Sequence, residues 1–347
     1  MSQEAYRSYL QSMVFGGVKM FVDAPSLLGA PYTQAGGVYH NGFVYVLGGF
    51  NATVRSDVSN IFSVNKADIG TPATTTVLGR ALNSVRTSCL VHKGKVYVFG
   101  GNYLNLTPEP DESTSSAKIY YGDPDDVTGL ISSWTDSATP FAQGREQVAV
   151  VSVGDDIYVA GGVHNDGSIE TPKDTVYYVT PVTNGSFPAV NAVQIMPEER
   201  YDGALVSYLG YLYYIGGTSD GDPYLTSIIS AKINADKSLG TWSEVSNLPR
   251  LSKSFNAFVY NGWLYILGGT DLGYATISYA KLLKNGEIDE NSWVDNSVPF
   301  PAGYNLGSFA VDTTNGWLYL AGGGEGGTVG VNDKIKGAKL ITPPYSG

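Results

Sequence analysis

Two arginines, Arg145 and Arg200, stand at the same distance from a recurring double glycine. Each lies sixteen residues before the first glycine of its pair (161 − 145 and 216 − 200). A guanidinium group holds a carboxylate through two parallel hydrogen bonds. If the two arginines occupy equivalent places in a repeated fold, we expect them to bind an acidic ligand.

Other charged and aromatic residues lie near the equivalent positions along the chain. They are Arg86, Glu146, Tyr201, Asp202, Lys253 and Tyr304. Tyrosine rings stack on sugar faces, so this set suits an acidic sugar such as sialic acid. The alternative is that the arginines and their acidic neighbours form ion pairs that tie adjacent structural units together. We treat all of these residues as candidate ligand contacts and assign none as catalytic.

The element that must position these residues is a sequence motif that recurs six times. It is an apolar, strand-like run that ends in two glycines. The second glycine stands at positions 49, 101, 162, 217, 269 and 323. A two-residue turn precedes each run, such as Asn41-Gly42 or Asn261-Gly262, and this is a strong hairpin signal. A period of about 50 residues with this pattern predicts propeller blades, which bury their faces by stacking around an axis.

The pattern resembles the kelch repeat, in which a double glycine after an apolar strand is followed by a spaced Tyr, a Trp and a Pro. The resemblance covers roughly residues 18–342 and keeps all six double glycines. The tryptophan is clear in three segments, as Trp134, Trp242 and Trp293, and is missing after Gly49 and Gly162. The resemblance implies an all-β, six-bladed propeller. It also implies that ligands gather at an axial mouth, formed where each innermost strand starts.

The two ends of the chain predict how the ring closes. The last blade lacks a fourth strand, and the run 18–25 supplies one, so the propeller spans residues 18–347 and has no open edge. Residues 1–17 form an N-terminal extension with apolar positions at helical spacing. We expect this extension to be a short helix that packs on the propeller or anchors the chain in a larger assembly.

Composition excludes several functional classes. The net charge of the 347 residues is 21 − 32 = −11, which argues against a nucleic-acid binder. No apolar run approaches the roughly 18–20 residues of a membrane span. Glu4 and Arg7 interrupt the first residues, so we expect no secretory signal and a location in the cytoplasm or in a virion.

No metal or cofactor is assigned. The single cysteine, Cys89, lies within a strand pattern and is expected to be an inert buried thiol. His40 and His92 share a position that holds tyrosine in other repeats, which indicates packing. The acidic loops do not match the calcium-binding loop.

These observations favour a non-enzymatic binding or assembly module that recognises a protein or a glycan. The turns after the third strands resemble those of bacterial and phage kelch-like proteins, which predicts a virion component at a tail or capsid surface. The alternative is a carbohydrate-active enzyme. Bacterial sialic-acid epimerases are six-bladed kelch propellers of similar length, and such an enzyme would use Arg145, Glu146 and Arg200 at the mouth.

Overall fold

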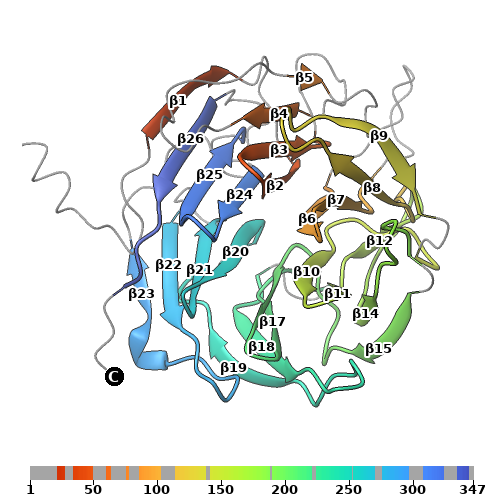
Figure 1. Ribbon diagram of the computed structural model, residues 1–347. Coiled ribbons are helices and arrows are strands. Elements are labelled where there is room, and N and C mark those ends of the chain that lie inside the picture. The colour runs from red at the N-terminus through yellow and green to blue at the C-terminus, as the bar shows by residue number, and fades with distance from the viewer. Residues whose placement is uncertain are drawn as a thin grey trace, which may run out of the picture.

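The structure is a computed structural model that describes residues 22–27, 34–49, 60–63, 76–77, 86–102, 114–137, 141–187, 190–220, 224–251, 253–269, 276–296, 308–323 and 334–343. Within these ranges the strands form six four-stranded antiparallel sheets, arranged as blades around a central axis (Figure 1). The prediction of an all-β propeller is therefore confirmed.

The first three blades each run outward from an innermost strand at the axis. The first contains β2 (Gly36–His40), β3 (Phe43–Leu47), β4 (Asn60–Ser63) and β5 (Thr76–Val77). The second contains β6 (Ser88–His92), β7 (Lys95–Phe99), β8 (Ile119–Pro124) and β9 (Ile131–Asp136). The third contains β10 (Ala149–Val153), β11 (Asp156–Ala160), β14 (Thr175–Val179) and β15 (Asn191–Ile195).

The remaining blades follow the same plan. The fourth contains β16 (Ala204–Tyr208), β17 (Tyr211–Ile215), β18 (Ser227–Lys232) and β19 (Ser243–Asn247). The fifth contains β20 (Phe255–Tyr260), β21 (Trp263–Gly268), β22 (Thr276–Lys281) and β23 (Val294–Asn296), with a short 3-10 helix, η1 (Glu290–Ser292), before β23. The sixth contains β24 (Ser308–Asp312), β25 (Trp317–Ala321) and β26 (Lys334–Lys339). A separate hairpin, β12 (Val163–Asn165) and β13 (Glu170–Pro172), extends from the third blade.

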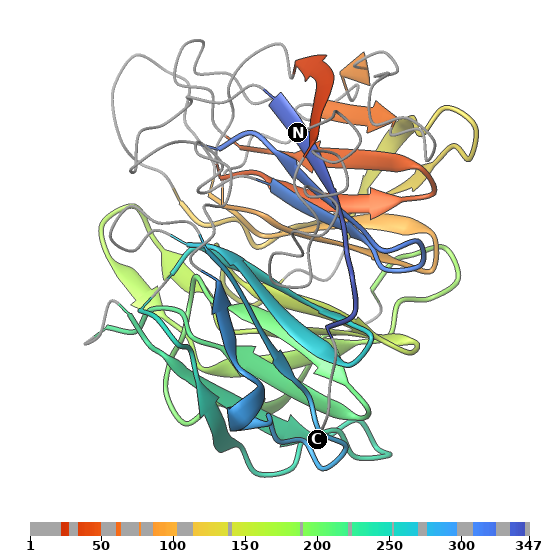
Figure 2. The ribbon, with the colours of Figure 1, turned by 90° about the vertical axis from the view of Figure 1, so that its left-hand side faces the viewer.

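The N-terminal strand closes the ring, as the sequence predicts. The strand β1 (Val22–Leu27) pairs with β26, with Val22 opposite Gly337 and Asp23 opposite Lys336. Figures 1 and 2 show the first and last segments of the chain side by side, across the ring from the fourth blade. The predicted extension, residues 1–17, lies outside the described residues.

The hydrophobic core formed by the described residues is divided into six clusters, and each cluster lies between two neighbouring blades. The same tyrosine position in every second strand is buried in these interfaces. Its members are Tyr45, Tyr97, Tyr158, Tyr213, Tyr265 and Tyr319. Burial of one face of each blade against the next is thus the main source of stability.

The buried tyrosines also join neighbouring blades by hydrogen bonds. The Tyr45 hydroxyl donates to the Gly129 carbonyl of the second blade at 2.9 Å, and the Tyr97 hydroxyl donates to Gly185 of the third at 3.1 Å. The hydroxyl of Tyr158 reaches the Lys237 carbonyl at 3.1 Å. Each bond crosses to a turn in the next blade, so a tyrosine hydroxyl in the core donates to a backbone carbonyl in a turn of the neighbouring blade.

The double glycines lie where the backbones of neighbouring blades approach each other closely. The amide of Gly162 donates to the Arg200 carbonyl at 2.9 Å, and a Cβ added to Gly161 would lie 2.1 Å from the same oxygen. Gly161 also has a φ of +64°. Gly100 has the same relation to Arg145, since its Cβ would lie 2.0 Å from the Arg145 carbonyl oxygen. Glycine is therefore required by space as well as by backbone conformation.

The side chains of Arg145 and Arg200 are buried, with 4% and 1% of their surface exposed, and they do not line the axial mouth. Arg145 donates through Nη1 to the Gly161 carbonyl at 3.0 Å and through Nη2 to the Tyr177 hydroxyl at 3.0 Å. Arg200 donates through Nη1 to the carbonyls of Gly216 and Ser227. This geometry corrects the expectation that they contact a ligand, because the guanidinium groups satisfy carbonyls at the ends of the second strands.

The structural role of the two arginines agrees in part with the alternative drawn from the sequence. Their backbone carbonyls accept from the preceding blade, while their side chains hold the double glycine of their own blade. Arg200 also forms an ion pair with Glu198. Most contacts are thus hydrogen bonds to backbone oxygen atoms, which a guanidinium fork can serve with several donors at once.

The close approach at Gly161 predicts a steric effect on stability. Gly161→Ala should lower the free energy of unfolding by about 2 kcal/mol or more beyond the loss in Gly154→Ala. Gly154 is the matched control, because it has a φ of +58° in the same blade but nothing within 4 Å of its added Cβ. Chemical denaturation measures both variants. Equal losses would mean that the contact with Arg200 imposes no steric constraint.

The buried arginines predict a stability loss instead of a loss of ligand. Arg200→Met should reduce the free energy of unfolding by about 3 kcal/mol, because buried carbonyl groups lose their donors. Arg250→Met is the control, since Arg250 is partly exposed and pairs with Asp295 on the outer strand β23. A stable Arg200 variant with unchanged unfolding would contradict the structural role.

Candidate ligand site at the axial mouth

One residue in each of five blades takes a left-handed backbone conformation just before the innermost strand. These residues, which we name the mouth ring, are Gln34, Arg86, Gln147, Asp202 and Ser254, with φ between 53° and 59°. Each stands fourteen residues before the first glycine of its pair, as 100 − 86 shows for the second blade. In the sixth blade the turn between the first two strands is two residues longer, because Asp312 pairs with Trp317, so the equivalent position by strand register is 306, which lies outside the described residues.

Backbone hydrogen bonds connect the mouth ring from blade to blade. The Arg86 amide donates to the Gln34 carbonyl at 2.9 Å, and the Gln147 amide donates to Arg86 at 3.1 Å. The series continues from Asp202 to Gln147 at 3.4 Å and from Ser254 to Asp202 at 3.3 Å. These bonds satisfy the backbone at the centre of the propeller and leave the side chains to face the axis.

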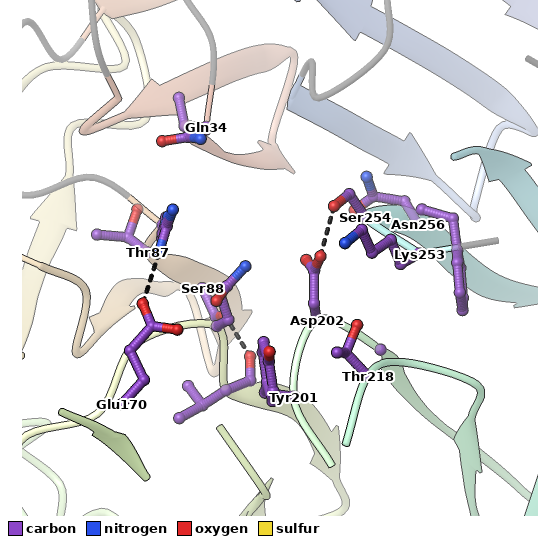
Figure 3. A pocket seen from close by; sticks show the side chains of 16 residues that line it. Gln34, Thr87, Ser88, Glu170, Tyr201, Asp202, Thr218, Lys253, Ser254 and Asn256 are labelled. Atoms are coloured by element: carbon purple, nitrogen blue, oxygen red, sulfur yellow. Dashed lines mark hydrogen bonds and ion pairs between the residues drawn. The ribbon is translucent and has the colours of Figure 1, made fainter. Parts of the chain in front are cut away.

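The mouth ring borders a cavity of about 430 Å³. Figure 3 shows side chains from several blades converging on it, among them Gln34, Glu170, Tyr201 and Lys253. A second cavity of about 480 Å³ continues from it between the innermost strands and shares Thr87, Ser88 and other lining residues. The mouth therefore leads into an axial channel, and its volume is in the range of small-ligand sites.

The structure places the predicted site residues in three groups. Arg86, Tyr201, Asp202 and Lys253 line the mouth cavity. Glu146 lies directly behind Arg86, and Arg145 and Arg200 lie in the buried contacts described above. Tyr304 lies outside the described residues.

The sequence reasoning missed Gln34, Gln147, Ser254 and Glu170. The signal was present in the spacing, because the mouth ring stands two residues after the arginine position used for the prediction. Nothing in the residue types marks that position, since glutamine, arginine and serine are not the residues that most often adopt positive φ. Glu170 belongs to β13, and predicting its place at the mouth requires knowing where the β12–β13 hairpin lies.

Arg86 is the centre of the charged contacts at the mouth. Its Nη1 lies 3.3 Å from Glu146 Oε2 and 3.7 Å from Glu170 Oε1. The Glu146 side chain is fully buried, and Asn102 Nδ2 donates to its other oxygen at 3.3 Å. Burial raises the pKa of the Glu146 carboxyl, and the nearby Arg86 guanidinium opposes that rise. Arg86 is thus held in place from behind by a carboxylate that has little contact with water.

Asp202 and Lys253 provide two more charged side chains at the mouth. The Ser254 hydroxyl donates to the Asp202 carboxylate, as the dashed line in Figure 3 marks. Burial raises the pKa of Asp202, and this hydrogen bond and the positive charge of Lys253 act in the opposite direction. Lys253 Nζ also lies 5.2 Å from the centre of the Tyr224 ring. The mouth therefore carries charges of both signs beside amide and hydroxyl groups.

Metal and nucleophile chemistry have little support in the part of the chain that the structure describes. No group of three or more histidine, cysteine or acidic side chains is placed to hold a metal ion there. Cys89 lies in the wall of the channel, and burial raises the pKa of its thiol to about 12, so the thiol is protonated at neutral pH. Over the same ranges, no helix has the length and apolar character needed to cross a membrane.

The buried Glu146 predicts a pH-dependent effect of removing Arg86. A carboxyl whose pKa is raised on folding favours the folded state below its ordinary pKa and loses that contribution as the pH rises. Arg86→Gln should raise the pKa of Glu146 further. We expect a loss of about 1–3 kcal/mol in the free energy of unfolding near neutral pH, and a smaller loss at about pH 4.5.

Denaturation of both proteins at the two pH values tests this prediction. Arg250→Gln is the control, because it removes an equal charge from a partly exposed ion pair. A loss for Arg86→Gln that does not change with pH would show that Glu146 is not the group affected.

Comparison with known proteins finds related sequences and solved structures of similar fold. No family model matches the sequence. Kelch-like protein 23 of Homo sapiens is 27% identical over 281 residues, which cover 76% of this chain and 45% of that protein. The Mus musculus protein of the same name is 28% identical over 284 residues, covering 77% and 46%. Kelch repeat protein M-T8 of myxoma virus is 26% identical over 151 residues, covering 43% and 26%.

The chain spans less than half the length of these curated relatives. A solved structure described as "Structure of YjhT" has a TM-score of 0.64 and 16% identity, and the match covers 90% of this chain and 95% of that one. At that identity the likeness concerns the fold alone. The sequence similarities and the ring of antiparallel sheets together support a kelch-type β-propeller.

Proposed function

We propose that this chain is a non-enzymatic binding module that holds a protein partner at the face surrounding the axial mouth. The observation that carries the proposal is the mouth ring: a hydrogen-bonded backbone holds five polar side chains around one cavity. Such a rigid arrangement reduces the entropy that is lost when a partner binds. The similarity to kelch-like proteins supports a protein-binding propeller.

The face around the mouth offers the polar and aromatic contacts that protein interfaces use. Tyr201 is held by backbone hydrogen bonds with Thr218, and its ring lines the cavity. The exposed Ile169, at 64% exposure, lies at the tip of the β12–β13 hairpin beside the mouth. Tyrosine anchors surrounded by polar groups are typical of binding hot spots. The net charge of −11 favours a partner whose surrounding surface is basic.

A glycan is the alternative ligand that we propose for the mouth, because the mouth combines a tyrosine with amide and hydroxyl side chains. The sequence-based enzyme alternative receives no further support. It depended on Arg145 and Arg200, whose guanidinium groups serve buried carbonyls. No observation therefore favours turnover of a sugar over binding.

The proposal predicts that substitutions on one face alone abolish partner binding. Tyr201→Ala combined with Lys253→Ala should weaken the affinity for the partner by at least about tenfold, because both side chains line the mouth. Affinity capture from the native source, with a binding measurement on each purified partner, provides the test.

The matched control removes exposed apolar side chains from the opposite face. Val127→Ala combined with Leu209→Ala changes residues that are 84% and 57% exposed in turns at the other end of the strands. We expect this control to bind as the unaltered protein does. Loss of the partner in the control, with binding retained in the mouth variant, would contradict the proposal.

The finer assignment to a phage virion, at a tail or capsid surface, is likewise a proposal. Its support is the resemblance of the turns after the third strands to those of bacterial and phage kelch-like proteins. Sedimentation of material from the native source tests it. Migration with a large particle would support an assembly role, and migration as a free protein of 36.9 kDa would exclude it under those conditions.

A further inference from the structure

Two carboxylates share one guanidinium group at the mouth. Glu146 Oε2 and Glu170 Oε1 both contact Nη1 of Arg86, at 3.3 Å and 3.7 Å. A guanidinium group carries five N–H donors in a planar fork. Among the described residues, the two carboxylates contact Nη1 alone and use at most two of these donors, so Arg86 can also bind an anion.

The two carboxylates differ in how tightly each is held beside Arg86. Glu146 is fully buried, lies at hydrogen-bond distance from Arg86 and is oriented by Asn102. Glu170 is 48% exposed, and its 3.7 Å contact is longer than a hydrogen bond. An exposed ion pair of this kind contributes about 0–1 kcal/mol. Glu146 is therefore the fixed partner of Arg86, and Glu170 is the one that a competing anion can displace.

The β12–β13 hairpin fixes Glu170 at the rim of the mouth. Glu170 pairs in register with Asn165, whose amide bonds to Ser115 Oγ at 2.8 Å. The turn between the strands is stabilised by Asp166, which accepts from the amides of Ser168 and Ile169. Because its backbone is anchored in this way, Glu170 can leave Arg86 by a side-chain rotation while the hairpin keeps its place.

Arg86 is open to the cavity as well. Its side chain is 35% exposed and lines the mouth together with Glu170 and Tyr201. In Figure 3 a dashed line runs from the labelled Glu170 carboxylate to its ion-pair partner, which is Nη1 of Arg86 at 3.7 Å. The Glu170 carboxylate thus lies beside the guanidinium group that an anion from solvent would contact.

We propose that Glu170 is an internal competitor: its carboxylate occupies the outer side of Arg86 until a ligand carboxylate replaces it. This inference rests on the proposed use of the mouth as a binding site and names the chemistry that the mouth recognises. The ligand carboxylate can belong to an acidic side chain of a protein or to an acidic sugar. In both cases Glu170 weakens binding and favours ligands that carry a carboxylate over neutral ones.

The experiment follows the Arg86 guanidinium directly by NMR. Isotope labelling of arginine gives a small set of signals, because the chain contains seven arginines, and Arg86→Gln assigns the one of interest. The unaltered protein and Glu170→Gln are titrated with two probes. One is a Gly-Glu-Gly peptide blocked at both ends, and the other is glucuronate. The probe that saturates Arg86 at the lower concentration identifies the source of the carboxylate.

Glu244→Gln is the matched control, since it removes the same charge from an exposed residue of the outer strand β19. We expect Glu170→Gln to tighten carboxylate binding by about two- to fivefold, the range for loss of an exposed ion pair, and Glu244→Gln to leave it unchanged. Equal affinities in all three proteins would overturn the competitor role, and so would a failure of both probes to shift Arg86 in any of them. Neither result would affect the face-specific test with Tyr201 and Lys253, which examines the proposed function separately.

Discussion

The close contact between the backbones of neighbouring blades is the constraint on which the rest of the structure depends. At the axis, amide and carbonyl groups of the mouth ring bond directly from one blade to the next. Slightly further out, the space beside Gly100 and Gly161 is filled by carbonyl oxygens of the following blade. A ring built on backbone contacts this short leaves little freedom in blade spacing, so the backbone positions that carry the polar side chains of the mouth ring are fixed.

The same residue type has two different roles within three positions of the repeat. Arg145 and Arg200, at the first position, satisfy carbonyl groups inside the ring and contribute stability. Arg86, two residues further along the repeat, lies in the mouth ring and faces the cavity. The difference follows from the left-handed conformation at the mouth ring, which turns the chain toward the axis. Charge at the mouth is therefore set by backbone geometry as much as by sequence.

The fold could be predicted from sequence because its signals are local and repeated. The double glycines and the two-residue turns define hairpins, and the unmatched strand at residues 18–25 indicated how the ring closes. The site was harder to predict. Register from the glycines located the start of the innermost strands, but the side chain that faces the axis depends on φ at a single residue, and Gln147 carries no sequence mark of it. Glu170, in the hairpin of the third blade, contacts Arg86 at the start of the second blade, and no local sequence pattern indicates a contact between residues this far apart in the chain.

Native-state hydrogen exchange, resolved to single amides, tests the central claim most directly. The claim is that backbone bonds between blades build the mouth. The amides of Arg86 and Gln147 border an open cavity, yet they donate across blade boundaries at 2.9 Å and 3.1 Å. We predict that they exchange as slowly as amides of the buried second strands, because exchange requires separation of the blades. Exchange as fast as that of exposed turns such as Lys93-Gly94 would contradict this claim.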